Sequence, residues 1–191
     1  MKSKNFWSFI VNPFTHIAGW QAFGIGLIFA VLTAVTGTLS NTAMDGALDT
    51  HYTFGLTYGQ SFLMQAINIV SVTLVMSLAA LFISKSFRFV DILGTMTLAK
   101  APYLIMALTG FLVKPEDLNN MMENISVMQI PSTMILLSLA AIPVMVWSIA
   151  LMYNGMKVSC DVKGAKLAIT FTIGLIVAEI LSKFLIYILL A

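Results

Sequence analysis

Five long apolar segments alternate with short polar connections along this chain. The segments cover residues 20–39, 61–84, 89–113, 131–153 and 167–190. Each is long enough to cross a hydrocarbon core ~30 Å thick, for which an α-helix needs ~20 residues. The pattern therefore predicts an all-α fold, a polytopic bundle of five transmembrane helices.

The segment before the first span has a different pattern. Aromatic and aliphatic side chains recur near helical spacing, with Lys2 and Lys4 in front of them. This predicts a short helix in the membrane interface, broken or bent at Pro13. No small-residue cleavage site follows, so we expect no cleaved signal peptide. The chain is thus divided into an N-terminal interfacial segment, residues 1–19, and a five-helix transmembrane domain, residues 20–191.

Basic residues fall almost entirely on alternate connections. Only Lys114 lies on the other set of connections. By the positive-inside rule, this distribution predicts a cytoplasmic N-terminus and, after five spans, a C-terminus outside. The seven basic residues on the predicted cytoplasmic side are Lys2, Lys4, Lys85, Arg88, Lys157, Lys163 and Lys166.

The composition narrows the range of functions. The residues are 59% hydrophobic and 9% charged, unlike those of a soluble domain. A net charge of +2, with the basic residues spread over separate connections, argues against a nucleic-acid partner. The chain contains no nucleotide-binding, hydrolase or zinc-protease motif, so we expect no enzymatic activity, cofactor or metal. Asp45, Asp49 and His51 are interpreted as solvated residues of the first outward connection, because three scattered ligands rarely hold a metal.

The first span carries small residues every four positions, at Ala22, Gly26, Ala30 and Ala34. Such a row lets another helix approach closely, and packing of this kind drives helix association in lipid. Two interpretations stay open at this point. The row packs within one subunit, or it forms the seam of a homodimer.

Two charged residues lie where lipid should exclude them. Lys100 is eleven residues into the third span and Glu179 twelve residues into the fifth. At ~1.5 Å per residue both sit roughly 16–18 Å deep, near the bilayer centre, so we predict that they face the bundle and pair. Lys183 stands one helical turn beyond Glu179 and is a second predicted partner.

Further polar features reach the same depth. Pro102 and Pro143 each leave a backbone carbonyl without its helical donor, and Asn68 lies on a polar face of the second span. We predict that these features converge on a mid-membrane polar site. It is either a small cavity for an ion, proton or lipid headgroup, or a buried ion pair that fixes helix register. The predicted members are Asn68, Lys100, Pro102, Pro143, Glu179 and Lys183.

Several stretches resemble the Yip1 domain family of five-span membrane proteins. They are residues 12–17 (NPFTHI), 86–94 (SFRFVDILG), 101–105 (APYLI), 147–153 and 164–168. The resemblance implies five spans and a cytoplasmic N-terminus. Eukaryotic members act in vesicle traffic and bind small GTPases through a long cytosolic region. This sequence lacks that region and also the D-L-Y-G-P motif that those members carry, so we do not expect GTPase binding.

The sequence thus favours a non-enzymatic Yip1-type protein of a bacterial cytoplasmic membrane. Its expected partners are membrane lipid, other membrane proteins or further copies of itself, which it organises through its helices. The alternative is a small transporter or channel for an ion, proton or lipid that uses the mid-membrane polar site. A cavity that reaches this depth favours transport, whereas a closed ion pair favours the first function.

Overall fold

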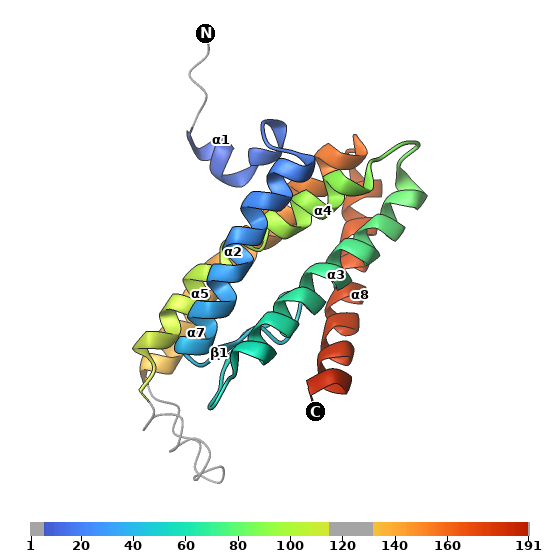
Figure 1. Cartoon of the computed structure of the whole chain (residues 1–191). Helices are drawn as coiled ribbons and strands as arrows, with labels where there is room; N and C mark the ends of the chain where they lie inside the picture. The colour runs from blue at the N-terminus through green and yellow to red at the C-terminus, as the bar shows by residue number, and fades with distance from the viewer. Residues whose placement is uncertain (1–5, 115–131, 191) are drawn as a thin grey trace.

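The computed structural model of the chain describes residues 6–114 and 132–190, with side chains from residue 9 onwards. These residues contain five helical spans long and apolar enough to cross a membrane. The spans are α2 (Gly19–Leu39), α3 (Tyr58–Ile83), the broken third span (Phe89–Leu112), α7 (Ser132–Cys160) and α8 (Ala165–Leu190) (Figure 1). The predicted all-α fold is confirmed, and the chain is an integral membrane protein.

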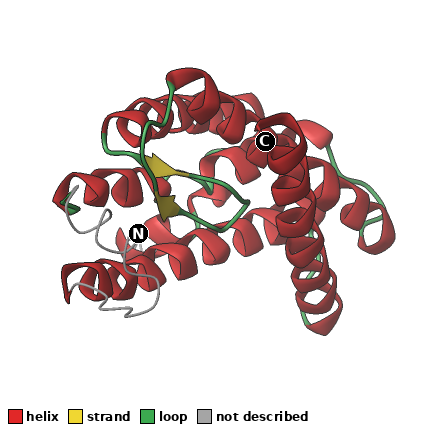
Figure 2. Cartoon of the chain, turned by 90° about the horizontal axis from the view of Figure 1, so that it is seen from below, coloured by secondary structure: helices red, strands yellow, loops and turns green. Residues whose placement is uncertain are grey.

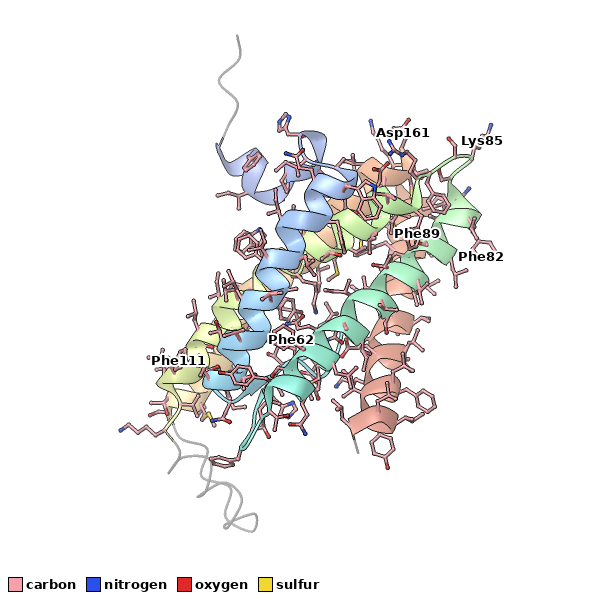
Figure 3. All side chains as sticks on the ribbon, in the orientation of Figure 1. Phe62, Phe82, Lys85, Phe89, Phe111 and Asp161 are labelled. Carbon is pink, nitrogen blue, oxygen red and sulfur yellow. The ribbon has the colours of Figure 1, made fainter. Side chains whose placement is uncertain are left out.

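The spans run back and forth between two ends of the bundle. Lys85 and Asp161 mark the end near the N-terminus, here called the N-terminal end, and Phe111 lies toward the opposite, far end (Figure 3). Phe82 and Phe111 are exposed on the outer surface of the bundle. Large apolar side chains on an outer surface suit contact with lipid tails, because a bilayer is as apolar as they are.

The N-terminal segment forms α1 (Phe6–Val11) and a 3₁₀ turn, η1 (Pro13–Thr15). The predicted break at Pro13 is confirmed, because proline can begin a helical turn but cannot continue one. Two side chains of α7 hold α1 against the bundle. The Trp147 indole donates to the Ile10 carbonyl at 3.1 Å, and the Asn154 amide donates to the Val11 carbonyl at 3.2 Å.

The small-residue row of α2 packs inside the chain. Ala22, Gly26, Ala30 and Ala34 are all buried, and α2 packs most extensively against α4 (Phe89–Leu98). A Cβ atom added at Gly26 would lie 2.6 Å from the backbone nitrogen of Leu98. The row therefore serves packing within one subunit, the first of the two interpretations.

The third span is broken at its middle. It consists of α4, a turn over residues 99–102, α5 (Tyr103–Thr109) and the 3₁₀ turn η2 (Gly110–Leu112). Pro102 ends the regular helical hydrogen bonding, as predicted. The freed carbonyls find other donors: the Ala101 amide donates to Leu98 at 3.0 Å, and the Ser148 hydroxyl donates to Ala99 at 2.7 Å.

The connection between α2 and α3 folds back into the bundle. Two short strands, β1 (Thr42–Ala43) and β2 (His51–Tyr52), pair antiparallel. Figure 2, viewed from below, shows these strands and their loop enclosed by helices. We call residues 43–50 the inserted loop. Ala43, Met44 and Ala47 of this connection are buried, whereas Asp49 and His51, interpreted as solvated residues, are exposed.

Candidate functional site

The inserted loop is held by Lys100, which projects from the turn between α4 and α5. The side chain is only 3% exposed, and its ammonium donates to the carbonyl of Ala47 at 2.6 Å. The same ammonium lies 4.0 Å from the centre of the Tyr103 ring, where the ring quadrupole attracts a cation. The break in the third span thus points a cation at loop backbone.

Glu179 binds the peptide group between Ala47 and Leu48, whose carbonyl is bound by Lys100. Its carboxylate accepts the backbone N–H of Leu48 at 2.7 Å. The Ala47 carbonyl and the Leu48 N–H belong to one peptide group, so this group lies between the two charges. Its oxygen contacts the ammonium and its N–H contacts the carboxylate, and both hydrogen bonds are of the stronger, charge-assisted kind.

The predicted direct pairing of Lys100 with Glu179 is therefore wrong. The ion pairs among the described residues, taken to 4.0 Å, do not include these two side chains. Both side chains do reach the same peptide group, but the prediction of direct pairing assumed that nothing else could lie between the helices. A peptide group carries one donor and one acceptor, and here it satisfies both charges at once.

Three further side chains bind the backbone of the inserted loop. The Ala47 N–H donates to the Ser182 hydroxyl at 2.9 Å, and the Tyr103 hydroxyl donates to the Leu48 carbonyl at 2.8 Å. The Asn68 amide donates to the Met44 carbonyl at 2.7 Å. Irregular backbone within a membrane is tolerated only where its polar groups are hydrogen-bonded, and these side chains provide the hydrogen bonds.

Gly46 is required by the close approach of the loop to Glu179. A Cβ atom at this position would collide with the carboxylate, with Oε2 only 3.0 Å away. The carboxylate cannot easily move aside, because its Oε2 accepts the Leu48 N–H. A residue with a side chain would therefore push the loop off α8.

A second group of charges surrounds the loop at the far end. Lys183 donates to the Asp49 carboxylate at 2.5 Å and lies 3.8 Å from Glu179, its predicted partner one turn away. His51 lies 3.2 Å from Asp45 through Nδ1. With His51 protonated, three cations (Lys100, Lys183, His51) balance three carboxylates. Asp45, Asp49 and His51 thus belong to a charge network, in which Asp49 and His51 stay exposed to solvent as interpreted and Asp45 is partly buried.

The pair of His51 and Asp45 should make the loop sensitive to pH. The hydrogen bond to Asp45 raises the pKa of His51 above its ordinary 6.5, against the opposing effect of partial burial. Burial acts to raise the pKa of Asp45, but the hydrogen bond and charge of His51 outweigh it, so this pKa falls below 3.8. Both groups are therefore charged between about pH 4 and 6.5.

We expect the pair to stabilise the loop most in this window. A raised histidine pKa gives stability that is complete below 6.5 and is lost as the pH rises through the shifted value. Stability from Asp45 is lost only as the pH falls through its lowered pKa. His51→Gln should remove this pH dependence of stability, which melting temperatures measured across the pH range would show. The lost stability should be less than ~1 kcal/mol, because the His51 side chain is half exposed. His16→Gln, at the other histidine, is the control; an unchanged pH profile in the His51 variant would contradict the pairing.

The structure brings together five of the six predicted site residues. Asn68, Lys100, Glu179 and Lys183 bind the loop or its charges, and Pro102 breaks the helix beside Lys100. Pro143 does not belong to the site, because it lies within the continuous helix α7 and is exposed.

Sequence reasoning missed the loop itself, together with Tyr103 and Ser182. The available signal was the run of residues 43–48 (AMDGAL), which is too apolar for a surface connection and contains a glycine. Charges predicted at mid-depth needed polar partners, and a nearby connection with an apolar stretch could have supplied them.

Cavities lined by described residues lie around these elements, and neither Lys100 nor Glu179 lines the two described below. One of them, of about 400 Å³, is an apolar groove between α1, η1, α2, α5 and α7. Another, of about 330 Å³, lies between α3 and α8 and is lined by Asp45, His51 and Lys183 on one side. Lys100 is thus covered by protein, whereas the Glu179 side chain stays 22% exposed, and these cavities lie to either side of the two charges.

Comparison of the chain with protein-family models, curated proteins and solved structures found no match. The resemblance to the Yip1 domain family accordingly stays a prediction from the sequence.

Proposed function

We propose that the protein is a non-enzymatic, Yip1-type membrane protein that organises membrane lipid, with the apolar groove as its lipid-binding surface. This groove is the observation that carries the proposal. Its volume of about 400 Å³ is that of a small-molecule site, and its lining is almost wholly apolar. Its lining includes Phe9, Phe29, Leu104 and Trp147 from helices, and Ile17 and Ala101 from the turns between elements.

The chemistry of the groove favours an acyl chain as its occupant. Hydrocarbon is the solvent at this depth, and an apolar wall offers no hydrogen bond that would select a polar ligand. The hydrogen bond from Trp147 to Ile10 places α1 along one side of the groove. A lipid held there would have its acyl chain among the helices and its headgroup close to the interfacial segment.

The alternative, transport through the mid-membrane polar site, has less support. Lys100 and Glu179 are each engaged by the inserted loop, and a permeating ion would have to displace that loop first. Displacement would leave several buried polar groups unpaired, each at a cost of several kcal/mol in lipid. The closed arrangement favours a structural role for these charges.

The orientation and location remain part of the proposal. The distribution of basic residues, seven against one, supports a cytoplasmic N-terminus. We further propose a bacterial cytoplasmic membrane as the location, and other membrane proteins or further copies of the chain as additional partners.

Filling the groove should weaken lipid retention. Leu104→Trp places a large ring in the groove, so we expect purified protein to retain several-fold less phospholipid in native mass spectrometry. Ile169→Trp is the matched control, because Ile169 is exposed on α8 and does not line the groove. Equal retention by both variants would contradict the proposal.

Vesicles with the unchanged protein should show no proton or potassium flux above empty vesicles, and a flux would favour the transport alternative.

A further inference from the structure

The second cavity at the far end has two chemically different walls. Asp45, His51 and Lys183 form a charged wall, and Met64, Tyr187 and Leu190 belong to an apolar wall. Lys183 and Leu190 are seven residues apart on α8, so the cavity reaches about 10 Å inward from the helix end at 1.5 Å per residue. Tyr187 is 73% exposed, which leaves the cavity accessible from the side of the bundle.

The charged wall keeps unused capacity for both signs of charge. Lys183 has three N–H donors, of which one is used on Asp49, and its side chain is 46% exposed. His51 contacts Asp45 through Nδ1, and its ring is 51% exposed, so Nε2 is available to a ligand. The Asp45 side chain is 26% exposed, and because its Oδ1 atom is buried, Oδ2, which faces His51, is the oxygen that a ligand can reach.

This combination fits a ligand with a phosphate and a primary ammonium group. Cations at Lys183 and His51 complement a phosphate, and the underused Asp45 carboxylate complements an ammonium that donates hydrogen bonds. Tyr187 and Leu190 lie between Lys183 and the end of α8, so they line the entrance through which a headgroup reaches the charged wall.

We propose that this cavity binds the headgroup of an aminophospholipid, with its phosphate at Lys183 and its amine at Asp45. The quaternary amine of a choline headgroup has no N–H to donate, so the cavity should discriminate against it. The inference goes beyond the proposed function, because it assigns headgroup selectivity to a different end of the bundle. The groove and this cavity share no lining residue, so either can fail alone.

Photo-crosslinking tests the proposal in the intact chain. A benzophenone amino acid replaces Tyr187, at the cavity, or Phe184, an exposed residue of α8 that does not line it. Each protein is placed in vesicles with equal amounts of phosphatidylethanolamine and phosphatidylcholine of matched acyl chains. We expect the ethanolamine adduct to exceed the choline adduct by about 5–10-fold at position 187, and the two to be equal at 184. Equal adducts at 187 would overturn the proposal.

Two charge variants locate the selectivity. Asp45→Asn and Lys183→Gln, in the chain labelled at 187, should each bring the adduct ratio close to one. Asp161→Asn and Lys166→Gln, exposed at the N-terminal end, are the controls and should leave the ratio unchanged. Because Lys183 also binds Asp49, the melting temperature of each variant is measured first. If a variant unfolds, the comparison of positions 187 and 184 in the chain without charge substitutions tests the proposal. A ratio that persists in both folded variants would show that the charged wall does not select the headgroup.

A third lipid distinguishes headgroup recognition from simple attraction of anions. In vesicles of phosphatidylethanolamine and phosphatidylglycerol, the ethanolamine adduct should again dominate at position 187. Preference for the anionic lipid would mean that Lys183 and His51 act without Asp45, and would overturn the proposed recognition of an amine.

Discussion

Replacing Glu179 with glutamine is expected to lower the free energy of unfolding by ~3–5 kcal/mol, because it leaves the buried Lys100 ammonium without a nearby counter-charge. Glutamine can still accept the Leu48 N–H, so the hydrogen bond itself survives the change. What is lost is the negative charge across the peptide group from Lys100, whose ammonium is almost completely buried. The remaining partners of Lys100 are then a carbonyl and an aromatic ring.

Lys100→Met should cost less, about 1–3 kcal/mol, because its main consequence is an Ala47 carbonyl without a donor. Glu179 keeps both the Leu48 N–H and Lys183 in that variant. The double variant carries no orphan charge, so we expect it to be about as stable as Lys100→Met alone. The two effects would then be strongly non-additive, although the side chains do not touch.

A double-mutant cycle measures this coupling, with unfolding in mixed detergent micelles as the readout. Glu179→Gln combined with Gly24→Ala is the control cycle, since a Cβ at Gly24 would meet no atom within 4 Å. Its effects should add. Additive effects for Lys100 and Glu179 as well would show that the peptide group does not transmit the charge interaction.

Hydropathy located the spans because the bilayer imposes both the helix and its length. The depth of Lys100 and Glu179 followed from the same constraint, since each residue of a helix adds a fixed rise. The sequence could not reveal what occupies the space between the two side chains. Two-residue strands such as β1 and β2 are too short to show any periodicity, so the inserted loop left no regular pattern.

The two prolines show a second limit of sequence reasoning. Both lie near the middle of a span, yet Pro102 faces the bundle and ends α4, whereas Pro143 is exposed within α7. Depth depends only on the distance along the helix, but the direction a side chain faces depends on helix rotation. That rotation is set by packing against neighbouring helices, which a single sequence does not contain.

Gly26→Ala should be among the most damaging single substitutions in the chain despite adding only one methyl group. The new Cβ would lie 2.6 Å from the backbone nitrogen of Leu98 and 2.8 Å from the carbonyl carbon of Thr97. Backbone atoms cannot rotate out of the way as a side chain can, so α2 and α4 would have to separate. Overpacking of this kind costs about 1–3 kcal/mol or more, and we expect the upper part of that range.

Gly24→Ala provides the matched comparison, because it makes the same change two residues away on the same helix. With no neighbour within 4 Å, its Cβ meets only lipid, and alanine favours a helix over glycine by up to ~1 kcal/mol. Unfolding in mixed detergent micelles should therefore rank the proteins Gly24→Ala, unchanged chain, Gly26→Ala in order of falling stability. Equal stability of the two variants would mean that α2 does not pack this closely on α4. Because α4 leads directly into the turn that carries Lys100, separating these helices should also loosen the clamp on the inserted loop.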